Sequence, residues 1–267
     1  MKIVSLCAGT LLFTTLVSVT VAESKTPKPS EIRGQVNFVG KLPDAEAQKI
    51  SGDKFCEQVH ASSPIMKDDI VINGNNTVKN VVVWISSGGP DQFYQSKGKD
   101  LPAATLLEEN CRVFPRVIAL QTGQKLVVKN NDQTINNINS QPRFNPRFNY
   151  ALMPGGDSKT LQFDKAEVPV KLKNDIHPWM VSWALVFDHP GYAITGEDGR
   201  FVIKDVPPGE YTLEAWQEKF GTVKAYVLVQ EDVPANVVFT YNNQGSKSGT
   251  QTDAKGNVTT GTIEQPR

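Results

Sequence analysis

The segment KNDIHPWM, from Lys173 to Met180, carries the residues of this chain that are best suited to hold a soft metal. His177 offers an imidazole nitrogen, and Met180 offers a thioether sulfur three positions later. Copper, and Cu(I) in particular, accepts both ligand types. The loop contains no cysteine, so it lacks the thiolate of a blue-copper site. The segment therefore predicts either a weak copper site on His177 and Met180 or a loop in which both side chains pack.

The segments around this loop have the pattern of β-strands. Short apolar or alternating runs are separated by turn residues: EIRGQVNFVGKLP, NVVVWISSGGP, CRVFPRVIAL, KLVVKNND, EVPVKLKN and WMVSWALVFD. Alternation with a period of two indicates half-buried strands. Helical periodicity is almost absent, and the one helical turn that we expect lies around 103–109. These patterns predict an all-β protein built from sandwiches.

The N-terminus has the features of a secretory signal peptide. Met1-Lys2 precedes an apolar run that ends at Ala22, and a leader at 23–30 with two prolines and two lysines follows. A permanent transmembrane helix is the alternative, but the Ser and Thr residues within the run disfavour it. We therefore expect a periplasmic or extracellular protein without a stable membrane anchor.

The overall composition excludes some partners. Lys plus Arg and Asp plus Glu are equal at 28 each, so no basic field points to nucleic acid. The last segment, 242–267, is rich in Gly, Ser, Thr, Asn and Lys, and is expected to be disordered.

Two cysteines remain once the signal peptide, which carries Cys7, is removed. Cys56 and Cys111 in an oxidising compartment most simply form a disulfide. A metal site that uses one of them is the alternative.

Several motifs occur together in a fixed order: FPRVIALQTGQKLVVKNND, INNIN, NDIHPWM and VFDHPGYAITGEDGRFVIKDVPPGEYTLEAWQE. In this order the segment 111–188 resembles the cupredoxin family, and most closely the bacterial exported proteins of the methylamine-utilisation or plastocyanin-like group. The resemblance implies a Greek-key sandwich. It also implies a copper site made by two histidines, a cysteine and a methionine.

Carried over residue by residue, the resemblance implies that part of this ligand set is lost. The first histidine position falls on Asn136, and a nearby family histidine falls on Asn139. The cysteine position falls on Asn174, whereas His177 and Met180 match. Because amides are poor copper donors, we expect no type-1 copper. The asparagines would form a hydrogen-bonded plug, or the loop would hold copper weakly. His189 also matches a family position, and a hydrogen-bonded turn histidine is expected there.

A second module follows. TGEDGRFVIKDVPPGEYTLEAWQE resembles the carboxypeptidase regulatory-like, or transthyretin-like, sandwich and implies such a fold at 189–241. The N-terminal β region, 31–110, opens with a strand of the same kind. One hypothesis is therefore a discontinuous sandwich in which 31–88 pairs with 190–241.

RFNPRFNY, from Arg143 to Tyr150, is a candidate interaction loop. Arg and aromatic residues are enriched in interface hot spots, and the alternative is a loop whose phenylalanines enter the core. The candidate contact residues are Arg143, Phe144, Arg147 and Phe148.

The chain has three histidines, and no arrangement of a nucleophile with a base is evident. We therefore expect a non-catalytic binding or structural protein without a cofactor. A copper protein that uses His177 and Met180 is the alternative. A protein partner, or docking on a redox enzyme, fits either reading.

Overall fold

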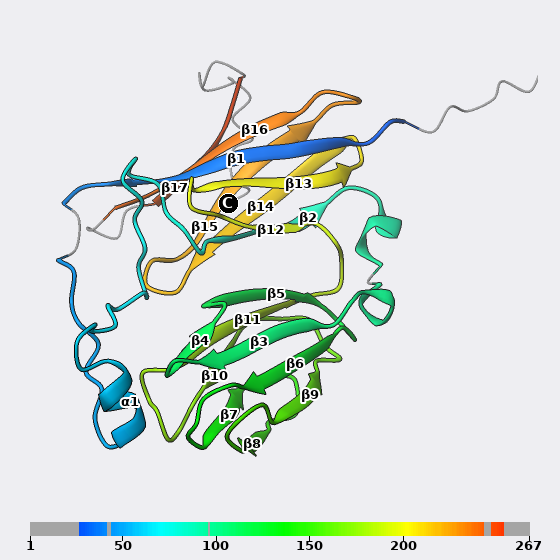
Figure 1. The fold of residues 1–267 in the computed structure, drawn as a ribbon. Helices are drawn as coiled ribbons and strands as arrows, with labels where there is room; N and C mark the ends of the chain where they lie inside the picture. The colour runs from blue at the N-terminus through cyan, green and yellow to red at the C-terminus, as the bar shows by residue number, and fades with distance from the viewer. Residues whose placement is uncertain (1–26, 42–43, 96, 243–246, 254–267) are drawn as a thin grey trace, which may run out of the picture.

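The computed structural model describes residues 27–41, 44–95, 97–242 and 247–253. The expected signal peptide and residues 23–26 of the leader lie outside the described residues. Nearly all regular structure is strand, arranged in four sheets that form two sandwiches (Figure 1). The all-β prediction is confirmed.

One sandwich, the terminal sandwich, is built from strands near both ends of the described chain. Its sheets have the strand orders β13-β1-β16-β17 and β12-β2-β14-β15. Its strands are β1 (Ser30–Val39), β2 (Val82–Gly88), β12 (Tyr192–Ile194), β13 (Arg200–Val206), β14 (Gly209–Gln217), β15 (Gly221–Val229), β16 (Ala235–Asn242) and β17 (Lys247–Thr252). β1 pairs antiparallel with β13 and parallel with β16, and β2 pairs with β12 and β14. Strands from 30–88 and 192–242 therefore share both sheets.

β17 lies in the segment that was expected to be disordered. It pairs antiparallel with β16 from Asn236–Thr252 to Tyr241–Lys247. The expectation is wrong for 247–252, because this polar strand satisfies its backbone hydrogen bonds along the edge of β16. Composition does not reveal a strand of this kind. The rest of the segment beyond Asp253, and 243–246, lie outside the described residues.

The central sandwich holds the loop with His177 and Met180. Its sheets have the orders β5-β11-β10-β7-β8 and β4-β3-β6-β9. Its strands are β3 (Ala104–Glu109), β4 (Arg112–Phe114), β5 (Val117–Gln121), β6 (Lys125–Asn130), β7 (Asn136–Gln141), β8 (Asn149–Leu152), β9 (Ser158–Gln162), β10 (Glu167–Lys173) and β11 (Val181–Phe187). Buried side chains from both sheets form one core, including Leu106, Leu126, Ile138 and Leu172.

This sandwich begins at β3 and not at Cys111. The helical turn expected around 103–109 is wrong, because this segment pairs with both β4 and β6. Leu106 and Glu108 alternate toward the interior.

The two sandwiches pack on each other through an apolar cluster and an ion pair. The cluster comprises Val82, Trp84, Val117, Leu185, Phe187 and Trp216. Arg116 binds the Glu218 carboxylate through two hydrogen bonds of 2.7 Å each, and contacts Asp68 at 3.0 Å. Burial lowers the pKa of Arg116, but the hydrogen bond with Glu218 and the charges of Glu218, Asp68 and Asp69 together outweigh it and raise that pKa overall.

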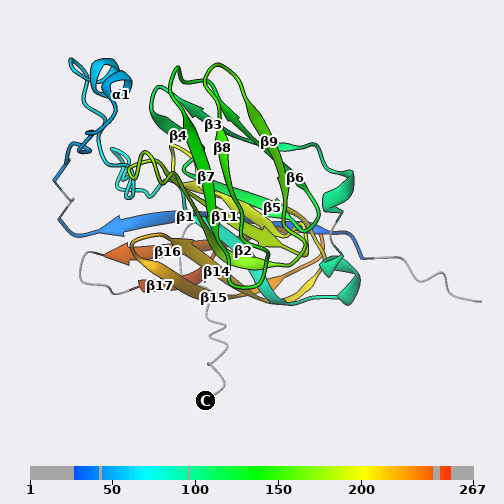
Figure 2. The same ribbon diagram turned by 90° about the horizontal axis from the view of Figure 1, so that it is seen from below.

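A long irregular segment between β1 and β2 covers one end of the central sandwich. It contains the helix α1 (Lys54–Val59), which lies beside this sandwich and away from the terminal one (Figures 1 and 2). Two short 3-10 helices, η1 (Asp91–Tyr94) and η2 (Gly98–Asp100), follow β2. Among the described residues, none of the helices has the length and apolarity needed to cross a membrane.

Candidate functional site

The loop between β10 and β11 turns its chemically useful side chains inward. Asn174 begins the loop, and its side-chain oxygen accepts hydrogen bonds of 2.9 Å from the backbone N–H groups of Ile176 and His177. The Met180 N–H donates to the His177 carbonyl at 2.8 Å and the Asn174 N–H to the Met180 carbonyl at 3.0 Å. His177 and Met180 are consequently buried, at 0% and 2% exposure.

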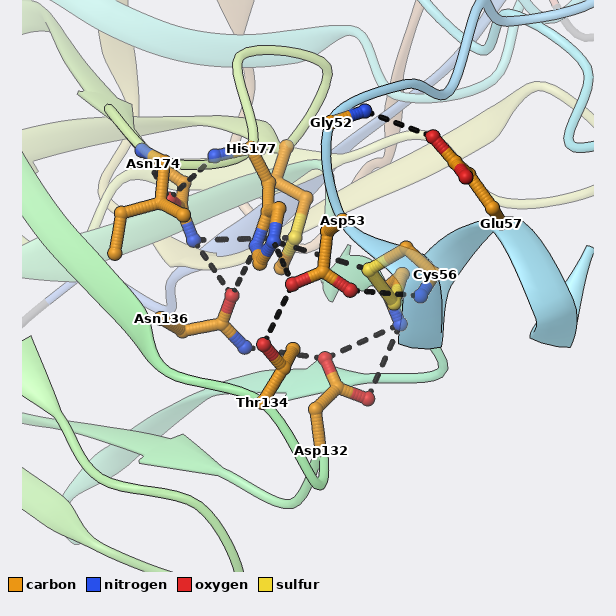
Figure 3. A network of polar contacts seen from close by, with 12 residues as sticks. Gly52, Asp53, Cys56, Glu57, Asp132, Thr134, Asn136, Asn174 and His177 are labelled. Atoms are coloured by element: carbon orange, nitrogen blue, oxygen red, sulfur yellow. Dashed lines mark hydrogen bonds and ion pairs between the residues drawn. A yellow bond between two sulfur atoms is a disulfide. The ribbon is translucent and has the colours of Figure 1, made fainter.

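One ring nitrogen of His177 contacts Asn136, which is bonded in turn to Asn174. Its Nδ1 atom lies 2.6 Å from Asn136 Oδ1, and Asn174 Nδ2 donates to the same oxygen at 2.8 Å (Figure 3). Met180 Sδ lies 3.9 Å from Asn174 Nδ2. The structure thus brings together the two predicted metal residues and the two predicted lost-ligand positions.

A chain of hydrogen bonds fixes the orientation of these amides. Asn130 is buried and donates from Nδ2 to three backbone carbonyls, those of Thr134, Leu152 and Met153, at 2.9–3.1 Å. Its oxygen must therefore face Asn136, which donates to it at 2.9 Å and to Asp132 Oδ2 at 3.1 Å. The Asn136 oxygen is left to face His177. It follows that His177 carries a hydrogen on Nδ1, which donates to Asn136.

This arrangement does not fit a type-1 copper ion. Such a site needs a thiolate and a second imidazole. The resemblance implies these ligands at 174 and 136, where this chain has asparagine amides. The two amides are bonded to each other, Asn136 also contacts His177 Nδ1, and Asn174 accepts from the His177 backbone N–H. The buried asparagines have the contacts of a hydrogen-bonded plug.

The other two predicted family positions lie apart from this cluster. Asn139 donates to Asp175 Oδ2 at 2.6 Å on a partly exposed surface. The His189 ring packs against Phe93, Tyr94 and Phe187, and its Nδ1 accepts from the Gly191 N–H at 3.0 Å. Burial lowers the pKa of His189.

The second ring nitrogen of His177 faces α1. Its Nε2 atom lies 3.3 Å from Asp53 Oδ2 and 3.9 Å from Cys56 Sγ (Figure 3). Cys56 forms a disulfide with Cys111, as predicted. Asp53 is the N-cap of α1: Oδ1 accepts from the Cys56 N–H at 2.9 Å, and Oδ2 accepts from the Thr134 hydroxyl at 2.7 Å. Burial raises the pKa of Asp53, but these donors and His177 outweigh it and leave the pKa below its ordinary value.

Two further contacts lie close to this cluster, one within the central sandwich and one between it and the end of α1. Trp179 donates from Nε1 to the Cys111 carbonyl at 2.9 Å, and its ring lies beside His177. His60, which ends α1, has Nε2 2.8 Å from the Asn110 carbonyl and Nδ1 3.1 Å from the Ser63 carbonyl.

Glu108 is a member of the cluster that sequence reasoning missed. It is 1% exposed, Asn174 Nδ2 lies 3.4 Å from Oε1, and Oε2 is a buried oxygen without a hydrogen-bond partner among the described residues. Burial raises the pKa of Glu108 to about 8. The hydrogen bond from Asn174 lowers this pKa, and the nearby negative charge of Asp132 raises it. Only its place two residues after Leu106 in an alternating strand could have indicated that it faces inward.

Hydrogen bonds to Glu167 anchor the backbone of the candidate interaction loop. Glu167 accepts backbone N–H groups of Arg143, Phe144 and Asn145, the last two at 3.1 and 3.2 Å. Burial raises the pKa of Glu167, but these donors and the Asn145 side-chain amide together outweigh it and lower the pKa overall. Phe144 is 64% exposed.

Phe148 behaves differently from Phe144. It packs against the core of the central sandwich, with its ring beside those of Phe163 and Tyr150. Of the two phenylalanines, therefore, one enters the core and one remains outside. Both arginines of the loop, Arg143 and Arg147, are exposed.

Comparisons with known proteins find solved structures that are similar to part of this chain. No protein-family model matches the chain, and no curated protein matches it. A copper-containing nitrite reductase from Thermus scotoductus matches with 18% identity and a TM-score of 0.30, over 32% of this chain and 22% of its own. A purple cupredoxin from Nitrosopumilus maritimus matches with 20% identity and a TM-score of 0.27, over 31% of this chain and 98% of its own. Amicyanin from Paracoccus versutus matches with 14% identity and a TM-score of 0.28, over 39% of this chain and 96% of its own.

Proposed function

We propose that this chain is an exported, cupredoxin-related binding or structural protein in which a hydrogen-bonded plug replaces type-1 copper. The observation that carries the proposal is the position of Asn136 Oδ1, 2.6 Å from His177 Nδ1 and 2.8 Å from Asn174 Nδ2. Asn136, which accepts a hydrogen bond from Asn174, holds the imidazole through the nitrogen on the side where the resemblance would put copper. The Cys56–Cys111 disulfide supports an oxidising compartment.

A non-catalytic role is part of this proposal. His177 and His189 are 0% and 4% exposed, so a substrate in solution does not reach either ring. Both ring nitrogens of His60 face backbone carbonyls. General acid–base chemistry by histidine would need a ring nitrogen within hydrogen-bond reach of a substrate. The transthyretin-like identity of the terminal sandwich stays a prediction, and we assign this sandwich a spacing or docking role.

Copper titration of the disulfide-intact protein tests the proposal. Cu(I) and Cu(II), titrated separately, are expected to bind more weakly than about 1 μM at this loop. A double variant, Asn136→His with Asn174→Cys, serves as the comparison, because it supplies the missing imidazole and thiolate beside His177 and Met180. It is expected to gain copper and an intense visible thiolate band. Tight copper binding by the wild type that His177→Ala abolishes would favour the copper-handling alternative.

We further propose that the partner is a protein and that it contacts the loop at 143–148. Support comes from Phe144, an exposed aromatic side chain on a backbone that Glu167 holds in one conformation. Such preorganisation lowers the entropy cost of binding. A photo-crosslinking amino acid at Phe144 is expected to capture this partner in cells, whereas one at Val202, which is also exposed but lies on β13, is not. Equal capture from both positions would contradict the assignment of the loop. A redox enzyme as partner is one outcome that the captured protein would identify.

A further inference from the structure

The Nε2 side of His177 is chemically distinct from the Nδ1 side. Three groups meet there: His177 Nε2, an Asp53 carboxylate oxygen and Cys56 Sγ, all within 4.8 Å of one another. His177 and Cys56 are buried, and the Asp53 side chain is 18% exposed. These three donors lie on two elements far apart in the sequence, α1 with its N-cap and the β10–β11 loop.

The hydrogen-bond chain prepares His177 as a ligand. Because Nδ1–H donates to Asn136 at 2.6 Å, Nε2 is the ring nitrogen that points toward Asp53 and the sulfur, and it is the nitrogen that can bind a metal ion in place of a proton. Metal-binding histidines in proteins commonly donate their other ring N–H to an oxygen in this way.

The spacing of the donors suits a tetrahedral ion. With bonds of about 2.0–2.3 Å, neighbouring ligand atoms around zinc lie roughly 3.3–3.8 Å apart. Here Nε2 is 3.3 Å from Asp53 Oδ2 and 3.9 Å from Cys56 Sγ. Cys56 in the disulfide is not a thiolate ligand, however, because its sulfur is bonded to Cys111.

We propose that reduction of the Cys56–Cys111 disulfide converts this cluster into a zinc site. A dithiol supplies two electrons and two protons, is itself oxidised to a disulfide, and leaves Cys56 and Cys111 as thiols. When Zn²⁺ binds, each thiol releases one proton to solvent. The ligands are the two thiolates, His177 Nε2 and the Asp53 carboxylate, a set of four that suits this ion. In the oxidised protein the Cys56–Cys111 disulfide joins these segments covalently, and in the reduced protein the metal takes over that role.

The test is zinc titration of the full mature chain after reduction with a phosphine, followed by calorimetry and a count of protected thiols. One Zn²⁺ is expected to bind the reduced protein tighter than about 1 μM, and the oxidised protein is expected not to bind at this level. Co²⁺ used as a probe is expected to give thiolate charge-transfer absorption that the Cys56→Ala variant lacks.

Asp53→Asn is the decisive variant, because asparagine also caps helices and α1 is expected to be retained. It is expected to weaken zinc binding at least about tenfold, or about 1.4 kcal/mol. His60→Gln, at the end of α1 but outside the donor set, is expected to bind zinc as the wild type does. Equal zinc affinity in Asp53→Asn and the wild type would overturn the proposal. So would a reduced chain that has lost its near-ultraviolet circular dichroism both without and with zinc, since the donors would then not be held together.

Discussion

His177 and Asn136 form the central contact of the polar cluster, with Nδ1 of the imidazole 2.6 Å from the amide oxygen. Both side chains are fully buried, and the asparagine lies on β7 while the histidine lies on the β10–β11 loop. The contact therefore ties two neighbouring strands at the end of the central sandwich. A buried polar contact of this kind stabilises only while all its members are paired.

Asn136→Ala is expected to lower the free energy of unfolding by at least about 2 kcal/mol. The change leaves His177 Nδ1, Asn174 Nδ2 and Asp132 Oδ2 without a shared partner in a buried place. Urea unfolding measures the loss. Asn139→Ala on the same strand is the control, since that amide reaches only Asp175 near the surface, and a change of about 0.5 kcal/mol is expected. Equal effects of both variants would mean that the plug contributes no stability.

Much of the framework around this cluster could be predicted from the sequence. Alternating apolar residues determine which face of a strand is buried, so β1, β10 and β11 can be predicted from the sequence. The disulfide followed from the two cysteines that remain after export. The positions of Asn136, Asn174, His177 and Met180 came from a resemblance, and the structure brings these side chains together.

The rest of the cluster could not be predicted, for physical reasons. Cys56 and His177 are in contact although 121 positions separate them in the sequence, and no local sequence pattern predicts such a contact. Asp53 reads as an ordinary N-cap, which it also is. In the pair Glu108-Glu109, neither residue type says which one faces the core, and β17 is a polar strand whose pairing comes only from β16.

Arg116→Met is expected to lower the free energy of unfolding by about 3–5 kcal/mol. Glu218, whose side chain is 8% exposed, would keep its charge at the sandwich interface without its guanidinium partner. Urea denaturation measures the effect, and the double variant Arg116→Met with Glu218→Gln is expected to recover much of the loss. Lys224→Met breaks a partly exposed pair with Glu214 and serves as control, with at most about 1 kcal/mol expected. A loss that the double variant does not recover would indicate that shape, and not the buried charge, dominates.

The two phenylalanines of the 143–148 loop are expected to differ in their effect on stability. Phe148→Ala removes a ring that packs against Phe163 and is expected to cost roughly 1–3 kcal/mol, less than a fully buried phenylalanine. Phe144→Ala is expected to change the free energy of unfolding by no more than about 0.5 kcal/mol, because the ring is 64% exposed. Thermal unfolding of both variants measures the difference. A large loss on changing Phe144 would assign that side chain to folding and weaken its place in a partner surface.

Glu108 is expected to make the protein less stable as pH rises. Its pKa in the folded protein, about 8, lies above the ordinary 4.5, so between these values the folded state holds a proton that the unfolded state releases. The free energy of unfolding from this group therefore falls as pH rises from 4.5 to 8, by at most about 1.4 kcal/mol per pH unit. Below pH 4.5 Glu108 is protonated in both the folded and the unfolded state, so it adds no pH dependence to the free energy of unfolding.

Glu108→Gln isolates this contribution, because glutamine has nearly the same shape and does not ionise. The variant is expected to unfold at nearly the same urea concentration as the wild type at pH 5, and at a higher one at pH 8. Glu109→Gln, on the neighbouring and partly exposed position, is expected to keep the pH slope of the wild type. If Glu108→Gln and the wild type instead lost stability in parallel between pH 5 and pH 8, the buried carboxyl would titrate normally. Its unpaired Oε2 would then have to reach water in solution.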